Sequence, residues 1–128
     1  MKRPSPGPSR SREERETAEA RGRKGEAYAA LWLRMKGWRI LAERVRTPAG
    51  EVDLVAKRGN LIAFVEVKTR ATSAELDHAI DDYRLRRVAA AAEILAPRFA
   101  TNGEDISIDV ILLAPRALPR HLVNVWHG

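Results

Sequence analysis

The stretch GEVDLVAKRGNLIAFVEVKTR, residues 50–70, decides the fold, because it has the pattern of two apolar strands joined by a short turn. Asp53, Glu66 and Lys68 interrupt these strands at positions where Val or Ile would pack better. Either the three charges lie on the solvated face of a sheet, or they are placed to hold a ligand.

The turn at Gly59-Asn60 predicts how the two acidic residues meet. Both turn residues tolerate a positive φ, as two-residue hairpin loops require. With Arg58 paired to Leu61, Asp53 lies directly opposite Glu66, with Cβ atoms about 4.5–5.5 Å apart. A three-residue loop would put the two carboxylates on opposite faces. A four-residue loop would keep them on one face, a diagonal step apart.

Two carboxylates held this close repel each other, and a divalent cation between them would reverse the sign of the interaction. Mg²⁺ is often held by one or two carboxylates together with phosphate oxygens. Lys68 emerges on the same face as Glu66 and could orient a water molecule or stabilise charge on a phosphate. The alternative is a cross-strand ion network on a solvated face, which would contribute little stability.

The rest of the chain predicts two helices and further strands around this hairpin. Residues 12–36 form a helix with an apolar stripe, which a break at Gly22 or Gly25 could interrupt and Gly37 could cap. The stripe comprises Ala27, Tyr28, Leu31, Trp32 and Met35. The other expected elements are strands at residues 38–45, 106–113 and 121–126, and a helix at residues 81–95 that ends before Pro97. The fold class is therefore α/β, with an antiparallel meander, a crossover helix and a parallel strand in one mixed sheet.

Length and composition predict a basic N-terminal tail, residues 1–12, disordered and rich in Pro and Ser, and one domain over residues 13–128. The chain has no cysteine, which excludes disulfides and thiolate metal sites and is compatible with a cytoplasmic location. No apolar run could span a bilayer or serve as a secretory signal. The net charge of +6 favours a polyanionic partner, nucleic acid first and an anionic membrane surface second.

The motif pair GEVDLV and FVEVKTR resembles the signature of the YraN-type family of uncharacterised proteins. That family in turn resembles the PD-(D/E)xK nuclease superfamily, which includes restriction enzymes and archaeal Holliday-junction resolvases. The similarity extends from about residue 22 to residue 126, through KGEAYAALWLRMKGWRIL, YRLRRVAAAAEIL and ISIDVILL. It implies a restriction endonuclease-like α-β-β-β-α-β core with a mixed sheet flanked by helices.

The resemblance also implies a DNA-cleaving site. Asp53, Glu66 and the carbonyl of Val67 would bind Mg²⁺ or Mn²⁺, and Lys68 would position the attacking water or stabilise the transition state. Glu26, on the first helix, matches the acidic position that supports the metal site. The metal would act as a Lewis acid and lower the pKa of bound water.

Basic residues near the predicted site are the candidates for phosphate contact. Arg70 follows the motif directly, and Arg84 and Arg87 share one face of the second helix while Arg86 points elsewhere. Each could equally lie on a solvated surface. Arg84 stands where the family usually has a lysine, and it keeps the charge but cannot exchange a proton near neutral pH.

The remaining unusual residues are expected to have structural roles. Asp109 lies in an apolar strand and is expected to be paired, with an arginine as the expected partner. Trp32 and Trp38 are expected in the core. The histidines His78, His121 and His127 lack metal-ligand spacing, so a zinc site is not expected.

Three functions remain open from the sequence. The first is a Mg²⁺-dependent endonuclease acting on DNA, including branched or damaged DNA, for which a homodimer would suit the cutting of two strands. The second is a non-catalytic nucleic-acid-binding module that keeps the nuclease fold. The third is a scaffold protein with an ordinary basic surface. Convergence of the Asp53 and Glu66 carboxylates beside an open groove would favour the first.

Overall fold

The computed structural model describes residues 12–70 and 82–126. Of the predicted tail, residues 1–12, only Arg12 is described, and α1 begins there; His78 and His127 lie outside the described residues. The elements are α1 (Arg12–Met35), β1 (Arg39–Thr47), β2 (Gly50–Arg58), β3 (Leu61–Thr69), α3 (Asp82–Phe99), β4 (Asp105–Leu113) and β5 (Arg120–Leu122). This order is the predicted α-β-β-β-α-β core followed by a short fifth strand.

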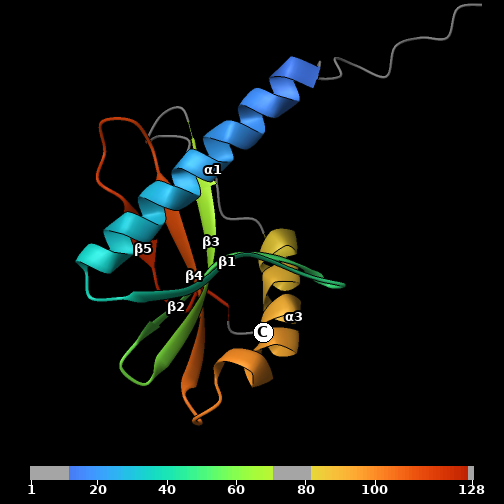
Figure 1. Ribbon diagram of the computed structural model, residues 1–128, viewed down its shortest axis with the longest axis vertical. Coiled ribbons are helices and arrows are strands. Elements are labelled where there is room, and N and C mark those ends of the chain that lie inside the picture. Colours follow the sequence, from blue (N-terminus) through green and yellow to red (C-terminus); the bar gives the residue numbers. More distant parts are fainter. Residues whose placement is uncertain (1–11, 71–81, 127–128) are drawn as a thin grey trace, which may run out of the picture.

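The five strands form one mixed sheet in the order β1-β2-β3-β4-β5. β1, β2 and β3 are antiparallel neighbours, and β3 pairs with β4 in parallel. The two helices cover opposite faces of the sheet, as Figure 1 shows, and the β1–β2 hairpin extends past α3. The predicted fold class is therefore confirmed. Neither α1 nor α3, the helices of the described residues, is long and apolar enough to cross a membrane.

The β2–β3 hairpin has the predicted register. Its loop is Gly59-Asn60, and Gly59 has a φ of 59°, the positive value that the first position of a type II′ turn needs. The ladder runs from Arg58↔Leu61 to Leu54↔Val65 and stops there. Asp53 and Glu66 would be the next pair, so the strands part where the acidic residues begin.

Each face of the sheet carries its own hydrophobic core. Under α3, the strand residues Val55, Ile62 and Phe64 pack with Leu85 and Val88 of the helix. On the α1 face the cluster comprises Ala29, Ala30, Leu33, Trp38, Leu54, Ala56, Ala63, Val65, Ile111 and Leu113. The middle of the β2–β3 hairpin is therefore buried on both faces, and Asp53, Glu66 and Lys68 lie toward the end away from the turn.

The apolar stripe predicted on α1 is not the face that packs on the sheet. Tyr28, Leu31 and Met35 are 51%, 54% and 75% exposed, and the small residues Ala29 and Ala30 are buried instead. Small side chains let the helix axis approach the strands closely, which the larger residues would prevent. Trp38 is buried as expected, whereas Trp32 is only half-buried.

A glycine explains why α1 continues without the predicted break. A Cβ atom on Gly25 would lie 2.7 Å from Oγ1 of Thr69, so the helix passes the end of β3 at a distance that only glycine allows. The helix is continuous from Arg12 to Met35, and Gly37 follows its end with a φ of 90°, as predicted for a cap.

Two other predicted boundaries were wrong. α3 does not end before Pro97 but continues to Phe99, with the proline inside its last turn. The main-chain N–H of Ala100 still donates to the carbonyl of Ala96, so the helix tolerates the missing proline donor at its exposed end. The final strand covers only Arg120–Leu122, and Asn124 shortly after it has a φ of 54°.

Candidate functional site

The site lies where β2 and β3 part. Oδ2 of Asp53 accepts a hydrogen bond of 2.7 Å from the main-chain N–H of Val67, two positions beyond Val65 of the last ladder pair. The carboxylate thus takes the place of a main-chain acceptor on β2. Because a strand residue directs its N–H and C=O to the same edge, the Val67 carbonyl also faces the Asp53 side of β3.

Asp53 has an unusual environment for a carboxylate. Its pKa is raised to about 7, by burial first and by the charge of Glu66 second, while the hydrogen bond from Val67 acts in the opposite direction. Glu26 and Glu51 also raise the pKa of Asp53, so four acidic residues act on one another here. Such a concentration of negative charge favours a bound cation.

Glu66 and Lys68 are both buried on β3, at 8% and 4% exposure. Lys68 Nζ lies 3.0 Å from Oε1 of Glu66, and Nη1 of Arg84 lies 3.8 Å from the same oxygen. The Lys68–Glu66 contact lacks hydrogen-bond geometry, and within the described part of the chain Nζ has no hydrogen-bond partner. A buried ammonium group with unused donors is suited to bind a water molecule or a phosphate oxygen.

Asp53, Glu66 and Arg84 line one open pocket of about 250 Å³. Glu51, Asp53 and Glu66 come from the strands, and Arg84, Arg87 and Val88 come from the first turns of α3. The pocket therefore has an acidic floor and a basic wall. An acidic floor suits a divalent cation, and a basic wall suits the phosphate that would share it.

The basic wall is fixed to the β1–β2 hairpin. Nε of Arg87 donates to the carbonyl of Ala49 at 3.5 Å, so this arginine ties α3 to the hairpin turn. Arg84 is also exposed, and its Nη1 approaches Glu66. Arg86 does not line the pocket, in agreement with its predicted direction.

Glu26 and Arg70 are placed differently from the other predicted residues. Glu26 does not line the pocket but lies beside it on α1, where Oε2 accepts a hydrogen bond of 2.6 Å from Nε of Arg44. Arg70 follows β3, and its main-chain N–H and its Nη1 donate to the carbonyls of Leu113 and Thr69. The structure thus gathers Asp53, Glu66, Lys68, Arg84 and Arg87 and leaves Arg70 outside the pocket.

The donor set fits a hard divalent cation bound with help from its substrate. Within residues 12–70 and 82–126, no three His, Cys, Asp or Glu side chains lie close enough together to hold a metal ion by themselves. Two of the three pocket carboxylates, Asp53 and Glu66, and the main-chain carbonyl of Val67 remain as candidate oxygen donors. Mg²⁺ and Mn²⁺ accept this kind of partial set and complete it with water and phosphate oxygens.

Sequence reasoning missed two residues of the site. Glu51 lines the pocket, and its position on the same strand face as Asp53 was the signal that could have found it. Arg44 contacts Glu26, and it has a φ of 52° that nothing in the sequence indicates.

The expected partner of Asp109 was wrong. Its Oδ2 lies 2.8 Å from Nε2 of His121, and its Oδ1 accepts a hydrogen bond from the main-chain N–H of Asn124. His121 also contacts the rings of Trp32 and Trp38 edge-on. Asp109 is thus paired, as expected, but with a histidine and the chain after β5 rather than with an arginine.

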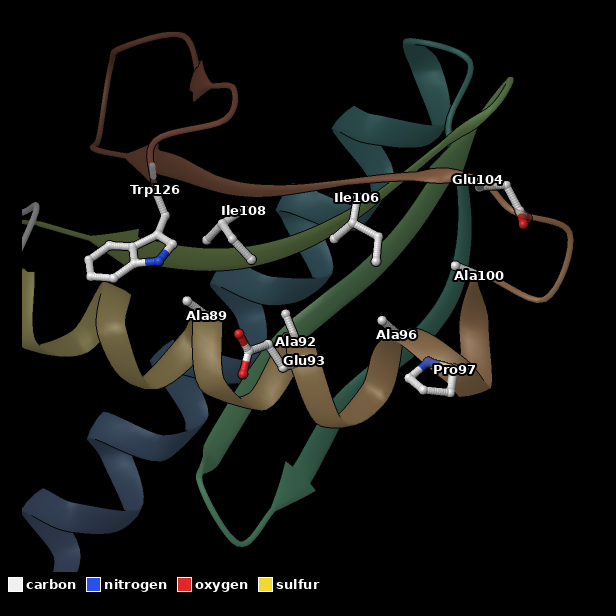
Figure 2. A pocket seen from close by; sticks show the side chains of 10 residues that line it. All are labelled: Ala89, Ala92, Glu93, Ala96, Pro97, Ala100, Glu104, Ile106, Ile108 and Trp126. Atoms are coloured by element: carbon white, nitrogen blue, oxygen red, sulfur yellow. The ribbon is translucent and has the colours of Figure 1, made fainter. Parts of the chain in front are cut away.

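A larger pocket, of about 580 Å³, lies between α3 and β4 (Figure 2). Alanines of α3 line one side, Ile106 and Ile108 of β4 line the other, and Trp126 and Glu104 stand at its two ends. Oε2 of Glu104 is paired with Nζ of Lys57 at 3.0 Å. This mostly apolar pocket shares no residue with the acidic pocket and lacks its array of carboxylates and cations.

Comparison with known proteins identifies the family. The sequence profile of the uncharacterised protein family UPF0102 matches residues 25–113, which include the whole β1–β4 region and α3. A UPF0102 protein of Erythrobacter litoralis is 69% identical over 112 residues, covering 88% of this chain and 97% of the relative. Relatives in Sphingopyxis alaskensis and Rhizorhabdus wittichii are 68% and 60% identical, covering 88% and 89% of this chain and 97% of each relative. The chain therefore belongs to UPF0102, the YraN-type family that its two strand motifs indicated.

Proposed function

We propose that this protein is a Mg²⁺- or Mn²⁺-dependent endonuclease that hydrolyses phosphodiester bonds of DNA, including branched or damaged DNA. The observation that carries the proposal is the acidic pocket, which Asp53 and Glu66 line together, with the buried ammonium group of Lys68 in contact with Glu66. The charge of Glu66 raises the pKa of Asp53, so the two carboxylates repel each other, and a divalent cation bound between them would relieve that repulsion.

Each residue has a role that follows from its position. Asp53, Glu66 and the Val67 carbonyl would hold the cation, which would supply Lewis-acid assistance when bound. Lys68 would hold the attacking water or a non-bridging phosphate oxygen with the donors that it does not use within the protein. Arg84 and Arg87 would bind the phosphates on either side of the scissile bond.

The surroundings of the pocket favour a nucleic acid over a small phosphate ester. The chain carries a net charge of +6, and Arg46 and Arg86 stand exposed on the β1–β2 hairpin and on α3. Basic side chains that continue beyond a pocket suit a long polyanion, which contacts phosphates on both sides of the reacting one.

The test is cleavage of linear, nicked, flapped and four-way DNA with Mg²⁺ or Mn²⁺. Glu66→Gln should abolish cleavage, because it removes a negative charge from the pocket with little change in shape. Glu93→Gln is the matched control, since Glu93 is exposed on α3 and lines the other pocket. Absence of metal-dependent cleavage of all four DNA forms, with the fold intact, would contradict the proposal.

One observation favours the second candidate, a binding module without turnover. Lys68 and Arg84 both neutralise Glu66, and no third carboxylate joins the two in a metal-binding group within the described residues. A binding module predicts salt-sensitive DNA affinity that is independent of Mg²⁺ and tolerant of Glu66→Gln.

A further inference from the structure

Arg44 has an uncommon backbone conformation beside the acidic pocket. It lies inside β1 with a φ of 52°, in the left-handed region that arginine rarely adopts in a strand. Its neighbours pair regularly with β2, as Glu43↔Leu54 and Val45↔Val52. The register therefore places Arg44 level with Asp53, in a break between two ladder pairs. Residues kept in such conformations cluster at functional sites.

The side chain of Arg44 links α1 to the acidic residues. Its Nε donates to Oε2 of Glu26 at 2.6 Å, and the side chains of Arg44 and Glu26 are 40% and 14% exposed. The pKa of Arg44 is raised by this hydrogen bond first, and also by the charges of Glu26, Glu51 and Asp53. One guanidinium group thus balances carboxylates from two elements, Glu26 of α1 and the acidic residues of β2.

The other acidic residues have separate cations. Glu51 pairs with Arg46 at 3.2 Å, and this pair is largely exposed, with 89% of the arginine side chain accessible. Glu66 pairs with Lys68. Within the described residues, Asp53 has no ion pair of its own and receives only the main-chain N–H of Val67. Arg44 lies level with Asp53 on β1 and its charge interacts with that carboxylate, so it would repel a cation bound at Asp53.

We propose that Arg44 is an internal counter-ion that holds Glu26 beside the pocket and competes with a divalent cation for the acidic residues. The inference rests on the proposed metal site but goes beyond it, because it assigns to an arginine the control of how tightly the site binds a cation. Arg44 is a positioning residue in this scheme, since it acts through Glu26 and through its charge. Removing that charge makes cation binding tighter.

The test is the affinity for Mn²⁺ alone, measured by calorimetry at pH 8 with the full-length protein. Arg44→Gln is expected to bind Mn²⁺ about fivefold more tightly than the wild type, because one opposing charge is lost at short range. Arg39→Gln is the matched control, because Arg39 is exposed on the same strand and pairs with Lys57 at the other end of the β1–β2 ladder. Loss of its charge should change the affinity less than about twofold. In a Glu26→Gln background, the gain from Arg44→Gln should shrink, since the two side chains act as a pair.

A glycine variant separates charge from backbone strain. Arg44→Gly keeps the left-handed conformation and also removes the charge, so its Mn²⁺ affinity should match that of Arg44→Gln. Its thermal midpoint should exceed that of Arg44→Gln. A structural role alone would move the midpoints without moving the affinity.

The outcomes distinguish this inference from the proposed function. Tighter Mn²⁺ binding by both Arg44 variants supports the inference even if no DNA is cleaved, in which case only the proposed nuclease activity fails. Unchanged or weaker binding by folded Arg44 variants overturns the inference, as does an equal gain in Arg39→Gln. Failure of all proteins to bind Mn²⁺ at millimolar concentration overturns both.

Discussion

Asp53 on β2 accepts the main-chain N–H of Val67 on β3 at 2.7 Å, in place of a ladder bond between the two strands. This one contact lets the strands part without leaving the Val67 donor unsatisfied. It also holds the Asp53 carboxylate in the pocket that Glu66 lines, and so joins the end of the hairpin to the candidate chemistry.

The first prediction concerns pH. The pKa of Asp53 is raised to about 7 in the folded protein from a value of 3.8, so its contribution to stability is complete below 3.8 and is lost as the pH rises through 7. Asp53→Asn should therefore be more stable than the wild type at pH 8, by at most about 4 kcal/mol, and the difference should shrink toward pH 4. Urea denaturation at several pH values measures this. A difference that does not vary with pH would contradict it.

The second prediction concerns the buried pair of Lys68 and Glu66. Lys68→Met should lower the free energy of unfolding by about 3 kcal/mol, because it leaves Glu66 buried without its close partner. The double variant Lys68→Met, Glu66→Leu should regain most of the loss, since no uncompensated charge remains. Chemical denaturation of the four proteins of this cycle gives the coupling energy. Additive losses would show that the pair is not coupled.

The third prediction concerns the basic wall. Arg84→Ala should weaken DNA binding and reduce the slope of log affinity against log salt by about 1, the effect of one lost phosphate contact. Arg86→Ala removes the same charge from a neighbouring exposed position outside the pocket and should change the slope less. Fluorescence anisotropy at several salt concentrations measures both. Equal slopes for the two variants would argue against a specific role of the pocket arginine.

The fourth prediction concerns the approach of α1 to β3. Gly25→Ala should destabilise the protein by about 1–3 kcal/mol, because the new Cβ atom would lie 2.7 Å from Oγ1 of Thr69. Gly22→Ala meets no atom within 4 Å and should stabilise by about 0.5–1 kcal/mol through helix propensity. Thermal unfolding distinguishes the opposite signs. Adding Thr69→Ala should relieve the Gly25→Ala variant, and no relief would show that the contact is not the cause.

Local patterns were sufficient to predict the hairpin and the sheet. The Gly59-Asn60 turn and the two-residue period of the strands gave the register from Arg58↔Leu61 to Leu54↔Val65. They also put Asp53, Glu66 and Lys68 on one face. The end of the ladder could not be predicted, because there the Asp53 carboxylate, and not a main-chain carbonyl of β2, accepts the main-chain N–H of Val67. The spacing of apolar and polar residues does not indicate such a replacement of a main-chain acceptor by a side chain.

Residues that meet through tertiary packing were beyond the sequence pattern. The apolar stripe of α1 and the small residues Ala29 and Ala30 both fit the helical period. Periodicity alone therefore predicted the wrong face of α1 as the buried one. The partner of Asp109 comes from β5, and nothing local favours His121 over an arginine. The left-handed conformation of Arg44 is set by its surroundings, which only the folded chain shows.

The missing side chain at position 25 also has a bearing on how variants of this protein should be interpreted. Glu26 is the next residue along α1, so the depth to which the helix settles against Thr69 sets where that carboxylate stands relative to Arg44. A substitution at Gly25 would therefore displace the Glu26 carboxylate, although Glu26 itself is unchanged. In a functional screen such a variant would score like the loss of a catalytic group, although the cause would be a shift of α1 that moves the adjacent Glu26.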